Sequence, residues 1–359
     1  MPTHYDIKKM VSCVDSDLPY ADASNEFCKA VMAIPDTPFA ETLKSLVCYD
    51  IFHKAEKILL SEEDPIPTYI QTLNDNTALL QAACFRKEPF TSHQVQIPKS
   101  IEQQTSLLYG SLFEKFDDRH YYDEAMKNIR ERFRRNNFDF SFVQGKSLLD
   151  AGCGNGRYAV ALKLLGFEKV VGLDRSDENI ATAEKRLKAS GIKDVTFQKG
   201  SVLNIPYPDN SFDSVFSNGV LHHTDDMEKG IKELLRVLKS EGKGFLYVIE
   251  APGGIFWDVI ECLRVLMHNV PFEIAQQVFS LLGVAANRRF YILDHIMVPI
   301  NTRSTPEQIE GLLKDAGAKN FRRLTRGCDY DRIEKIYEKV PYHNIKYGVG
   351  ENRYFFDKP

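Results

Sequence analysis

A glycine-rich turn that follows a short apolar strand constrains this chain more than any other feature. Residues 147–158 read SLLDAGCGNGRY, in which an apolar run ends in an aspartate, three glycines follow at alternate positions, and a helix begins. Glycine permits a sharp turn and a close approach of a ligand to the main chain, and a helix N-terminus offers unpaired N–H groups to an anionic group. We therefore expect a ligand at the end of this strand.

The residues after Gly145 alternate between short apolar runs and amphipathic helices, which is the signature of βαβ units that build a parallel sheet. Five strands are expected, at Ser147–Ala151, Lys169–Leu173, Val195–Lys199, Phe212–Ser217 and Gly244–Ile249. Thr305–Gln308 predicts a further helix start, because a Thr cap, a Pro and a Gln stand at the positions of a capping box. This part of the chain is predicted to be α/β.

The first 140 residues differ, because their apolar residues recur mainly at helical spacing. Helices are expected over residues 39–60, 69–83, 101–116 and 121–133, with a break at Pro65-Ile-Pro67. We expect two domains: a mostly helical N-terminal region at 1–140, acting as a lid, substrate selector or dimer contact, and an α/β domain at 141–359. Residues 252–303 are expected to be a helical insertion after strand five that covers the strand ends.

Composition and charge exclude several classes of protein. With 43% hydrophobic and 27% charged residues the chain is globular, and its net charge of −4 gives no overall attraction to nucleic acid or an anionic membrane. The seven cysteines form no C-x-x-C motif, so no metal site is expected. No apolar run approaches the roughly 18 residues of a membrane span, and no secretory leader is recognised. A cytoplasmic protein is expected, with a homodimer as a candidate assembly.

The spacing of the glycines separates two cofactor classes. A dinucleotide fingerprint is G-x-G-x-x-G, whereas Gly152, Gly154 and Gly156 follow the pattern G-x-G-x-G, with Asp150 two positions before the first glycine. Asp174 ends the next strand, where a carboxylate accepts hydrogen bonds from ribose hydroxyls. The turn by itself could be structural or serve NAD, so an NAD-dependent oxidoreductase is an alternative, and a cofactor-binding protein without turnover is another.

Several motifs in order make the chain resemble the class I S-adenosylmethionine-dependent methyltransferases, in particular the ubiquinone/menaquinone-methyltransferase-like branch that acts on small molecules. They lie at residues 150–156, 172–174, 200–206, 212–223 and 235–244. The resemblance covers roughly residues 145–250 and extends more weakly to about residue 330. It implies a Rossmann-like seven-stranded sheet with helices on both faces, and S-adenosylmethionine as the cofactor.

The resemblance also implies a set of cofactor contacts. Asp150 and the glycine turn would hold the methionine part of the cofactor, Asp174 the ribose, and Asn218 the floor beneath the sulfonium. Many relatives carry Asp where Ser201 stands, so the adenine edge would be held by a weaker acceptor. The full set is Asp150, Gly152, Gly154, Gly156, Tyr158, Asp174, Arg175, Ser201, Val202 and Asn218.

Methyl transfer mainly requires an acceptor atom placed in line with the methyl group, and a hydroxyl acceptor must also lose a proton. His222 and His223 follow the fourth strand, at the ligand-bearing edge, and a neutral histidine is suited to accept that proton. A histidine at this place also commonly orients backbone or packs under the cofactor. Glu250, after the fifth strand, and His295, in the insertion, are the other catalytic candidates.

The acceptor is expected to be a small molecule. Residues 219–221 are Gly-Val-Leu, and they lack the Pro-Pro-aromatic sequence found after strand four in nucleic-acid base methyltransferases. The basic residues around 127–135 are interrupted by Glu131 and predict a solvated helix face, so no nucleic-acid partner is expected. O-methylation of a hydroxylated metabolite is the first prediction, and N- or S-methylation is the alternative.

Overall fold

The computed structural model describes residues 18–83 and 121–359. The chain folds into two compact units. Within the described residues, the sheet unit comprises 121–251, 299–338 and 350–359, and the helical unit comprises 18–83, 252–298 and 339–349. The expected helix at 101–116 lies outside the described residues.

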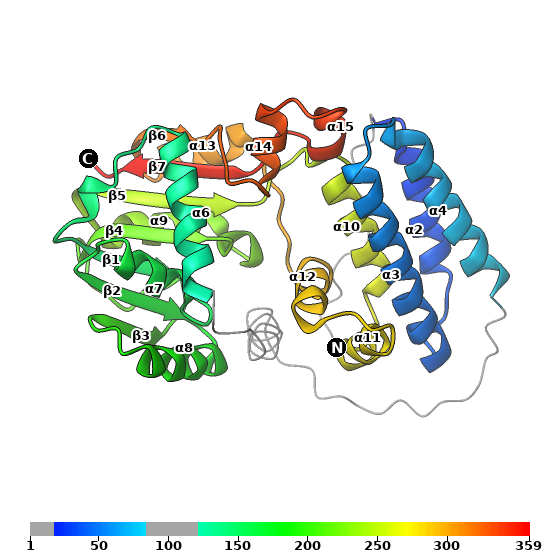
Figure 1. The fold of residues 1–359 in the computed structure, drawn as a ribbon, viewed down its shortest axis with the longest axis horizontal. Helices are drawn as coiled ribbons and strands as arrows, with labels where there is room; N and C mark the ends of the chain where they lie inside the picture. The colour runs from blue at the N-terminus through cyan, green and yellow to red at the C-terminus, as the bar shows by residue number, and fades with distance from the viewer. Residues whose placement is uncertain (1–17, 84–120) are drawn as a thin grey trace. The chain divides into compact units, whose positions relative to one another are not determined.

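The sheet unit is built on one seven-stranded sheet with the order β3-β2-β1-β4-β5-β7-β6 (Figure 1). Its strands are β1 (Ser147–Ala151), β2 (Lys169–Asp174), β3 (Val195–Lys199), β4 (Phe212–Asn218), β5 (Leu238–Val248), β6 (Lys319–Arg323) and β7 (Asn352–Asp357). Strands β1 to β5 pair in parallel, and β7 pairs antiparallel to both β5 and β6. The predicted seven-stranded α/β sheet is confirmed. Strand β5 begins earlier than expected, because Leu238 pairs with Phe212 before a register shift.

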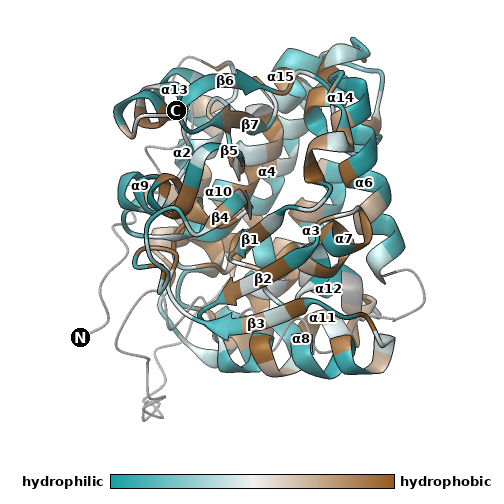
Figure 2. Ribbon diagram, turned by 90° about the vertical axis from the view of Figure 1, so that its left-hand side faces the viewer, coloured by the Kyte–Doolittle hydropathy of each residue, from teal (hydrophilic) through white to brown (hydrophobic). Residues whose placement is uncertain are grey.

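Helices cover both faces of this sheet. They are α6 (Tyr121–Arg135), α7 (Arg157–Leu164) and α8 (Asp177–Ser190) on one face, and α9 (Met227–Val237) and α13 (Pro306–Asp315) on the other. Successive strand residues point to opposite faces, so Leu148 joins the first core and Leu149 the second. In Figure 2, helix α9 has a brown and a teal part, as expected for a helix with one buried side. The parallel strands are therefore covered on both faces.

The helical unit is organised around one helix that is buried along nearly its whole length. Its helices are α2 (Ala21–Met32), α3 (Pro38–Leu60), α4 (Pro65–Ala82), α10 (Gly254–Met267), α11 (Phe272–Leu281), α12 (Ala286–Ile296) and α15 (His343–Tyr347). Helix α10 contacts α2, α3, α12 and α15. Even Asp258 and Arg264 are buried there, where Asp258 accepts a hydrogen bond from the Tyr20 hydroxyl at 2.8 Å and Arg264 donates to the Val298 carbonyl at 2.7 Å.

The units therefore differ from the division at residue 140 that the sequence suggests. Helix α10 is buried along nearly its whole length and is covered by helices of the N-terminal region, so residues 252–298 fold with the N-terminal helices. Helix α6 lies before residue 140 but buries Ile129 and Phe133 in the core of the sheet unit. Periodicity in the sequence identifies these helices and does not identify their packing partners.

The structure contains the predicted helix start at Thr305 and a break before Pro65. The capping box at Thr305 is confirmed, because its hydroxyl accepts from the Gln308 N–H while the Gln308 side chain accepts from the Thr305 N–H. The predicted break between two helices lies at residues 61–64, and Pro65 begins helix α4, since a proline at the first helical position loses no hydrogen bond. None of the described helices is long and apolar enough to cross a lipid bilayer.

Candidate active site

Three glycines in the left-handed backbone region form the turn between β1 and α7. Gly152, Gly154 and Gly156 have φ angles of +85°, +53° and +82°, which side-chain-bearing residues rarely adopt. A Cβ atom at Gly156 would lie 2.5 Å from the Phe197 ring, and one at Gly152 would collide with Val220. The Gly152 N–H donates to the Leu173 carbonyl at 2.8 Å, which fixes the turn against β2. Both conformation and space therefore require glycine here.

Asp150 is a buried carboxylate at the edge where this turn begins. It is 2% exposed and pairs in register with Gly172 of β2 and Phe216 of β4. Asp174 and Asn218 each follow two residues beyond these partners, so they lie at the carboxyl ends of the flanking strands. Burial, together with the nearby charge of Asp174, raises the pKa of the Asp150 carboxyl to about 8. The site therefore favours a cation beside Asp150.

Asp174 is held by the protein itself. Its Oδ2 accepts from the Gly154 N–H at 2.8 Å, and its Oδ1 accepts from the Ser176 N–H at 2.9 Å and from the Asn179 side chain at 3.1 Å. Burial raises the pKa of this carboxyl, and the hydrogen bonds oppose that shift. Together with a further bond from the Arg175 N–H, these bonds use most of the roughly four acceptor positions of a carboxylate, and the contact of Asp174 with the ribose stays a prediction.

Three buried polar atoms near the turn have no hydrogen-bond partner among the described residues. They are Oδ2 of Asp150, Oδ1 of Asn218 and Nδ2 of Asn155. Two acceptors and one donor match the ammonium and carboxylate groups at the amino-acid end of S-adenosylmethionine, so the residues present fit that cofactor. Asn155 is absent from the predicted contacts, although its position between two motif glycines is a signal that could have identified it.

Three other predicted cofactor contacts, Val202, Ser201 and Tyr158, interact with other residues of the protein. Val202 is 7% exposed and packs in the core beneath α9, and its contact with an adenine stays a prediction. The Ser201 hydroxyl accepts from the Leu203 N–H at 3.1 Å. The Tyr158 ring packs on Phe216 with centroids 5.8 Å apart. Arg175 directly follows β2, and its contact with the cofactor stays a prediction.

The two histidines lie together in a short 3-10 turn, Leu221–His223, directly beyond β4. His222 is buried, His223 is partly exposed, and their ring centroids are 4.0 Å apart. The His223 Nδ1 atom lies 2.7 Å from the Ile300 carbonyl oxygen. Since a carbonyl only accepts, Nδ1 carries the hydrogen, and Nε2 is the acceptor nitrogen of the neutral ring. The neutral ring of His223 is therefore in the tautomer that a general base acting through Nε2 requires.

The other two catalytic candidates, Glu250 and His295, differ from the histidine pair in their surroundings. Glu250 is fully buried, and the Arg332 guanidinium donates to both of its oxygens, at 2.7 and 3.2 Å. This two-pronged ion pair argues against the predicted proton-transfer role of Glu250, because loss of its charge would leave a buried arginine uncompensated. His295 belongs to α12 of the helical unit, where its ring packs on Tyr291 and Trp257.

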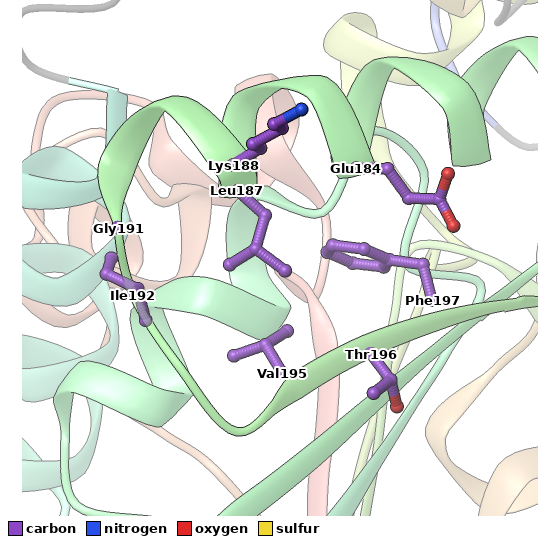
Figure 3. Close-up of a pocket in the computed structure, with 8 residues that line it drawn as sticks. All are labelled: Glu184, Leu187, Lys188, Gly191, Ile192, Val195, Thr196 and Phe197. Atoms are coloured by element: carbon purple, nitrogen blue, oxygen red, sulfur yellow. The ribbon is translucent and has the colours of Figure 1, made fainter.

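A cavity of about 470 Å³ opens elsewhere in the sheet unit, between α8 and β3 (Figure 3). Leu187, Val195 and Phe197 point into it, and Glu184 and Lys188 lie on the α8 side. None of the site residues predicted from the sequence lines this cavity. Phe197 also faces Gly156, so its ring separates the cavity from the glycine turn. This cavity is not the predicted cofactor site.

Replacement of Asp174 tests the turn directly. Asp174→Ala is expected to weaken S-adenosylmethionine binding about 10- to 200-fold, since a charged hydrogen bond contributes about 1.5–3 kcal/mol and the Gly154 contact is lost too. Isothermal titration calorimetry measures the affinity. The matched control is Asp177→Ala, which removes an exposed carboxylate paired with Lys199 and should change the affinity less than twofold. Equal affinities for the two variants would reject the assignment of Asp174.

The part of the chain that contains the glycine turn is similar in sequence to known proteins. A family model described as "Methyltransferase domain" matches residues 149–246. An uncharacterised methyltransferase of Bacillus subtilis, YcgJ, is 33% identical over 105 residues, which are 29% of this chain and 41% of that protein. Its crystal structure superposes with a TM-score of 0.43 at 14% identity, over 66% of this chain and 98% of that chain.

Two further relatives have named activities. A 27-O-demethylrifamycin SV methyltransferase of Amycolatopsis mediterranei is 33% identical over 31% of this chain and 42% of that protein. A demethylmenaquinone methyltransferase of Symbiobacterium thermophilum is 28% identical over 42% of this chain and 61% of that protein. The chain thus spans between 41% and 61% of the length of these three relatives. The family model includes the glycine turn, so residues 149–246 of the sheet unit form a methyltransferase domain, and the cofactor of this family is S-adenosylmethionine.

Proposed function

We propose that this protein transfers the methyl group of S-adenosylmethionine to a hydroxyl oxygen of a small-molecule acceptor. The observation that carries this proposal is the buried Asp150 carboxylate beside Asp174 at the glycine turn. A ligand with a sulfonium and an ammonium group relieves the repulsion between these carboxylates. A dinucleotide would instead bring a negatively charged pyrophosphate to the same turn, so the carboxylate pair argues against an NAD-dependent oxidoreductase.

The residues of the chain have distinct tasks in this proposal. Asp150, Asn155 and Asn218 hold the amino-acid end of the cofactor, and Asp174 holds the ribose while it fixes the turn. When bound, the cofactor supplies a methyl group on a positively charged sulfur, open to in-line displacement. His223 accepts the proton of the acceptor hydroxyl at Nε2, because Nδ1–H is engaged by the Ile300 carbonyl.

The relatives support a small-molecule acceptor. The names of two of them specify a rifamycin and a demethylmenaquinone as the molecules they methylate. The net charge of −4 also argues against nucleic acid, because phosphate backbones are recognised mainly by basic surfaces. A cytoplasmic location and a homodimer stay predictions from the sequence.

Ligand-induced stabilisation tests the cofactor assignment. S-adenosylmethionine and S-adenosylhomocysteine at 100 times their Kd should each stabilise the full chain by about 2.7 kcal/mol, measurable as a higher Tm in differential scanning calorimetry. NAD at the same concentration serves as the control and should leave Tm unchanged. Stabilisation by NAD and not by S-adenosylmethionine would reverse the assignment.

Transfer itself is tested with methyl-labelled S-adenosylmethionine and a panel of phenols, hydroxyquinones, amines and thiols. Label is expected on oxygen in the hydroxylated acceptors, because a neutral histidine removes the proton that a hydroxyl must lose. Label on nitrogen or sulfur alone would replace the proposed acceptor atom. Tight cofactor binding without transfer to any acceptor in the panel would favour a cofactor-binding protein without turnover.

A further inference from the structure

We propose that residues 299–304, here called the strap, are a positioning element that fixes the tautomer of His223. The inference rests on the proposed function, because it assigns His223 Nε2 as the proton acceptor. The strap follows Val298, the last residue of the second segment of the helical unit, and belongs to the sheet unit. It acts through backbone groups, so no side chain in this segment identifies it as part of the site.

The C-terminal end of the strap is fixed to the sheet. The Ser304 N–H donates to the Ile249 carbonyl at 3.2 Å, and the Ser304 carbonyl accepts from the Ala251 N–H at 2.8 Å. The buried Asn352 side chain donates to the same carbonyl at 2.7 Å. These bonds make a parallel bridge between Ser304 and Glu250 at the end of β5. The strap is therefore anchored where the parallel strands end.

The middle of the strap holds the two histidines. The Thr302 N–H donates to the His222 carbonyl at 2.9 Å, which ties the strap to the turn after β4. Two residues earlier, the Ile300 carbonyl accepts from Nδ1–H of His223 at 2.7 Å. With both ends of the contact fixed, the other tautomer would set the lone pair of Nδ1 against the carbonyl oxygen, which is unfavourable. The geometry therefore selects a ring with its lone pair on Nε2.

The carboxylate of Glu250 is not available to orient the His223 ring. A catalytic histidine is frequently oriented by a carboxylate, and Glu250 bridges to the strap through its backbone. The Glu250 side chain, however, is paired with Arg332. The orienting acceptor of His223 is thus the neutral Ile300 carbonyl.

The first experiment measures the tautomer in the full-length protein without a ligand. Protein labelled with ¹⁵N-histidine is studied by long-range ¹H–¹⁵N correlation NMR, at a pH where the ring is neutral, and His223→Gln assigns the signals. We expect hydrogen on Nδ1 of His223 and none on Nε2. Hydrogen on Nε2, or a mixture of comparable populations, would overturn the proposal, whatever the protein methylates.

The second experiment removes one anchor of the strap. Thr302→Pro deletes the N–H that binds His222, whereas Thr302→Ala deletes only an exposed side chain and retains that N–H. We expect the Nδ1–H of His223 to exchange with solvent at least tenfold faster in the Pro variant, and at the wild-type rate in the Ala variant. An unchanged rate in a folded Pro variant would refute the positioning role. If the Pro variant does not fold, the wild-type tautomer decides.

The experiments distinguish failure of the proposed catalytic role of His223 from failure of the positioning role of the strap. If the tautomer and the exchange rates are as expected but His223→Ala methylates normally, the strap positions His223 without serving as part of a proton transfer. If the NMR results contradict the expectation while His223→Ala is inactive, His223 is catalytic and the strap does not fix its tautomer. The two proposals therefore fail independently.

Discussion

His223→Ala is expected to lower kcat by about 10²- to 10⁴-fold, while S-adenosylmethionine affinity stays within twofold of the wild type. The reason is that the ring supplies the acceptor for the proton of the substrate hydroxyl, whereas the cofactor contacts come from the glycine turn and the strand ends. Label transfer to an acceptor found in the panel measures kcat, and calorimetry measures the cofactor affinity. A loss of affinity equal to the loss of kcat would show that His223 supports the cofactor instead.

The matched control for this variant is His343→Ala. His343 is also partly exposed, and its Nδ1 also lies near a backbone carbonyl, that of Val340 at 3.0 Å. It belongs to α15 of the helical unit and is not among the proposed site residues. The control is therefore expected to keep wild-type kcat. Equal losses in both variants would mean that the effect of His223→Ala is general and not catalytic.

Asp150→Asn is expected to have two opposite effects, weaker cofactor binding and a more stable cofactor-free protein. Loss of the carboxylate charge should weaken S-adenosylmethionine binding by about 10²-fold, on the scale of charged hydrogen bonds. In the free protein the same replacement removes a buried carboxylate whose pKa of about 8 reflects the cost of ionising it. At pH 8 we expect the free energy of unfolding of the cofactor-free variant to rise by roughly 2–4 kcal/mol.

The sign of the pH dependence follows from the direction of this shift. Because the pKa of Asp150 is raised in the folded protein, its favourable contribution is complete below pH 4 and is lost as the pH rises through about 8. Cofactor binding shows the reverse trend, because a cation favours the ionised carboxylate. The wild-type affinity should therefore increase by up to tenfold per pH unit between pH 6 and 8. In the Asn variant only the titration of the cofactor's own amino group should remain.

Asp213→Asn is the matched control for Asp150→Asn. Partial burial raises the pKa of the Asp213 carboxyl. Hydrogen bonds from Ser147 and the paired Lys239 ammonium outweigh this effect and lower the pKa to about 2. Its replacement should therefore destabilise the protein, in contrast to the Asp150 variant, and leave cofactor affinity unchanged. Urea unfolding at pH 5 and pH 8 measures the stabilities. If Asp150→Asn gained no stability at pH 8, the repulsion between the buried carboxylates of Asp150 and Asp174 would be contradicted.

Much of the sheet unit could be predicted from short stretches of sequence. The run from Ser147 to Gly156 encodes a strand, an acidic end and a turn that only glycine accommodates, and the structure has them in that order. Thr305 and Gln308 likewise encode a helix start within four residues. In both cases the deciding interactions are local, so the residue types and their spacing contain the information.

Other features could not be predicted, because residues far apart in the chain determine them. Glu250 suggests a catalytic carboxylate when read at the end of its strand, but the structure pairs it with Arg332, 82 residues later. The orienting group of His223 is a backbone carbonyl 77 residues away, and every residue type has that group. No residue pattern could therefore have indicated either contact.

The sequence by itself determined that this chain forms a parallel α/β sheet with a cofactor turn after β1, because backbone preferences and hydrophobic alternation act over a few residues. Only the tertiary structure decided that residues 252–298 fold with the N-terminal helices, that Glu250 is paired with Arg332, and that Nδ1 of His223 carries the hydrogen. These outcomes depend on which distant groups meet in a buried environment, where an unpaired charge or polar group is costly.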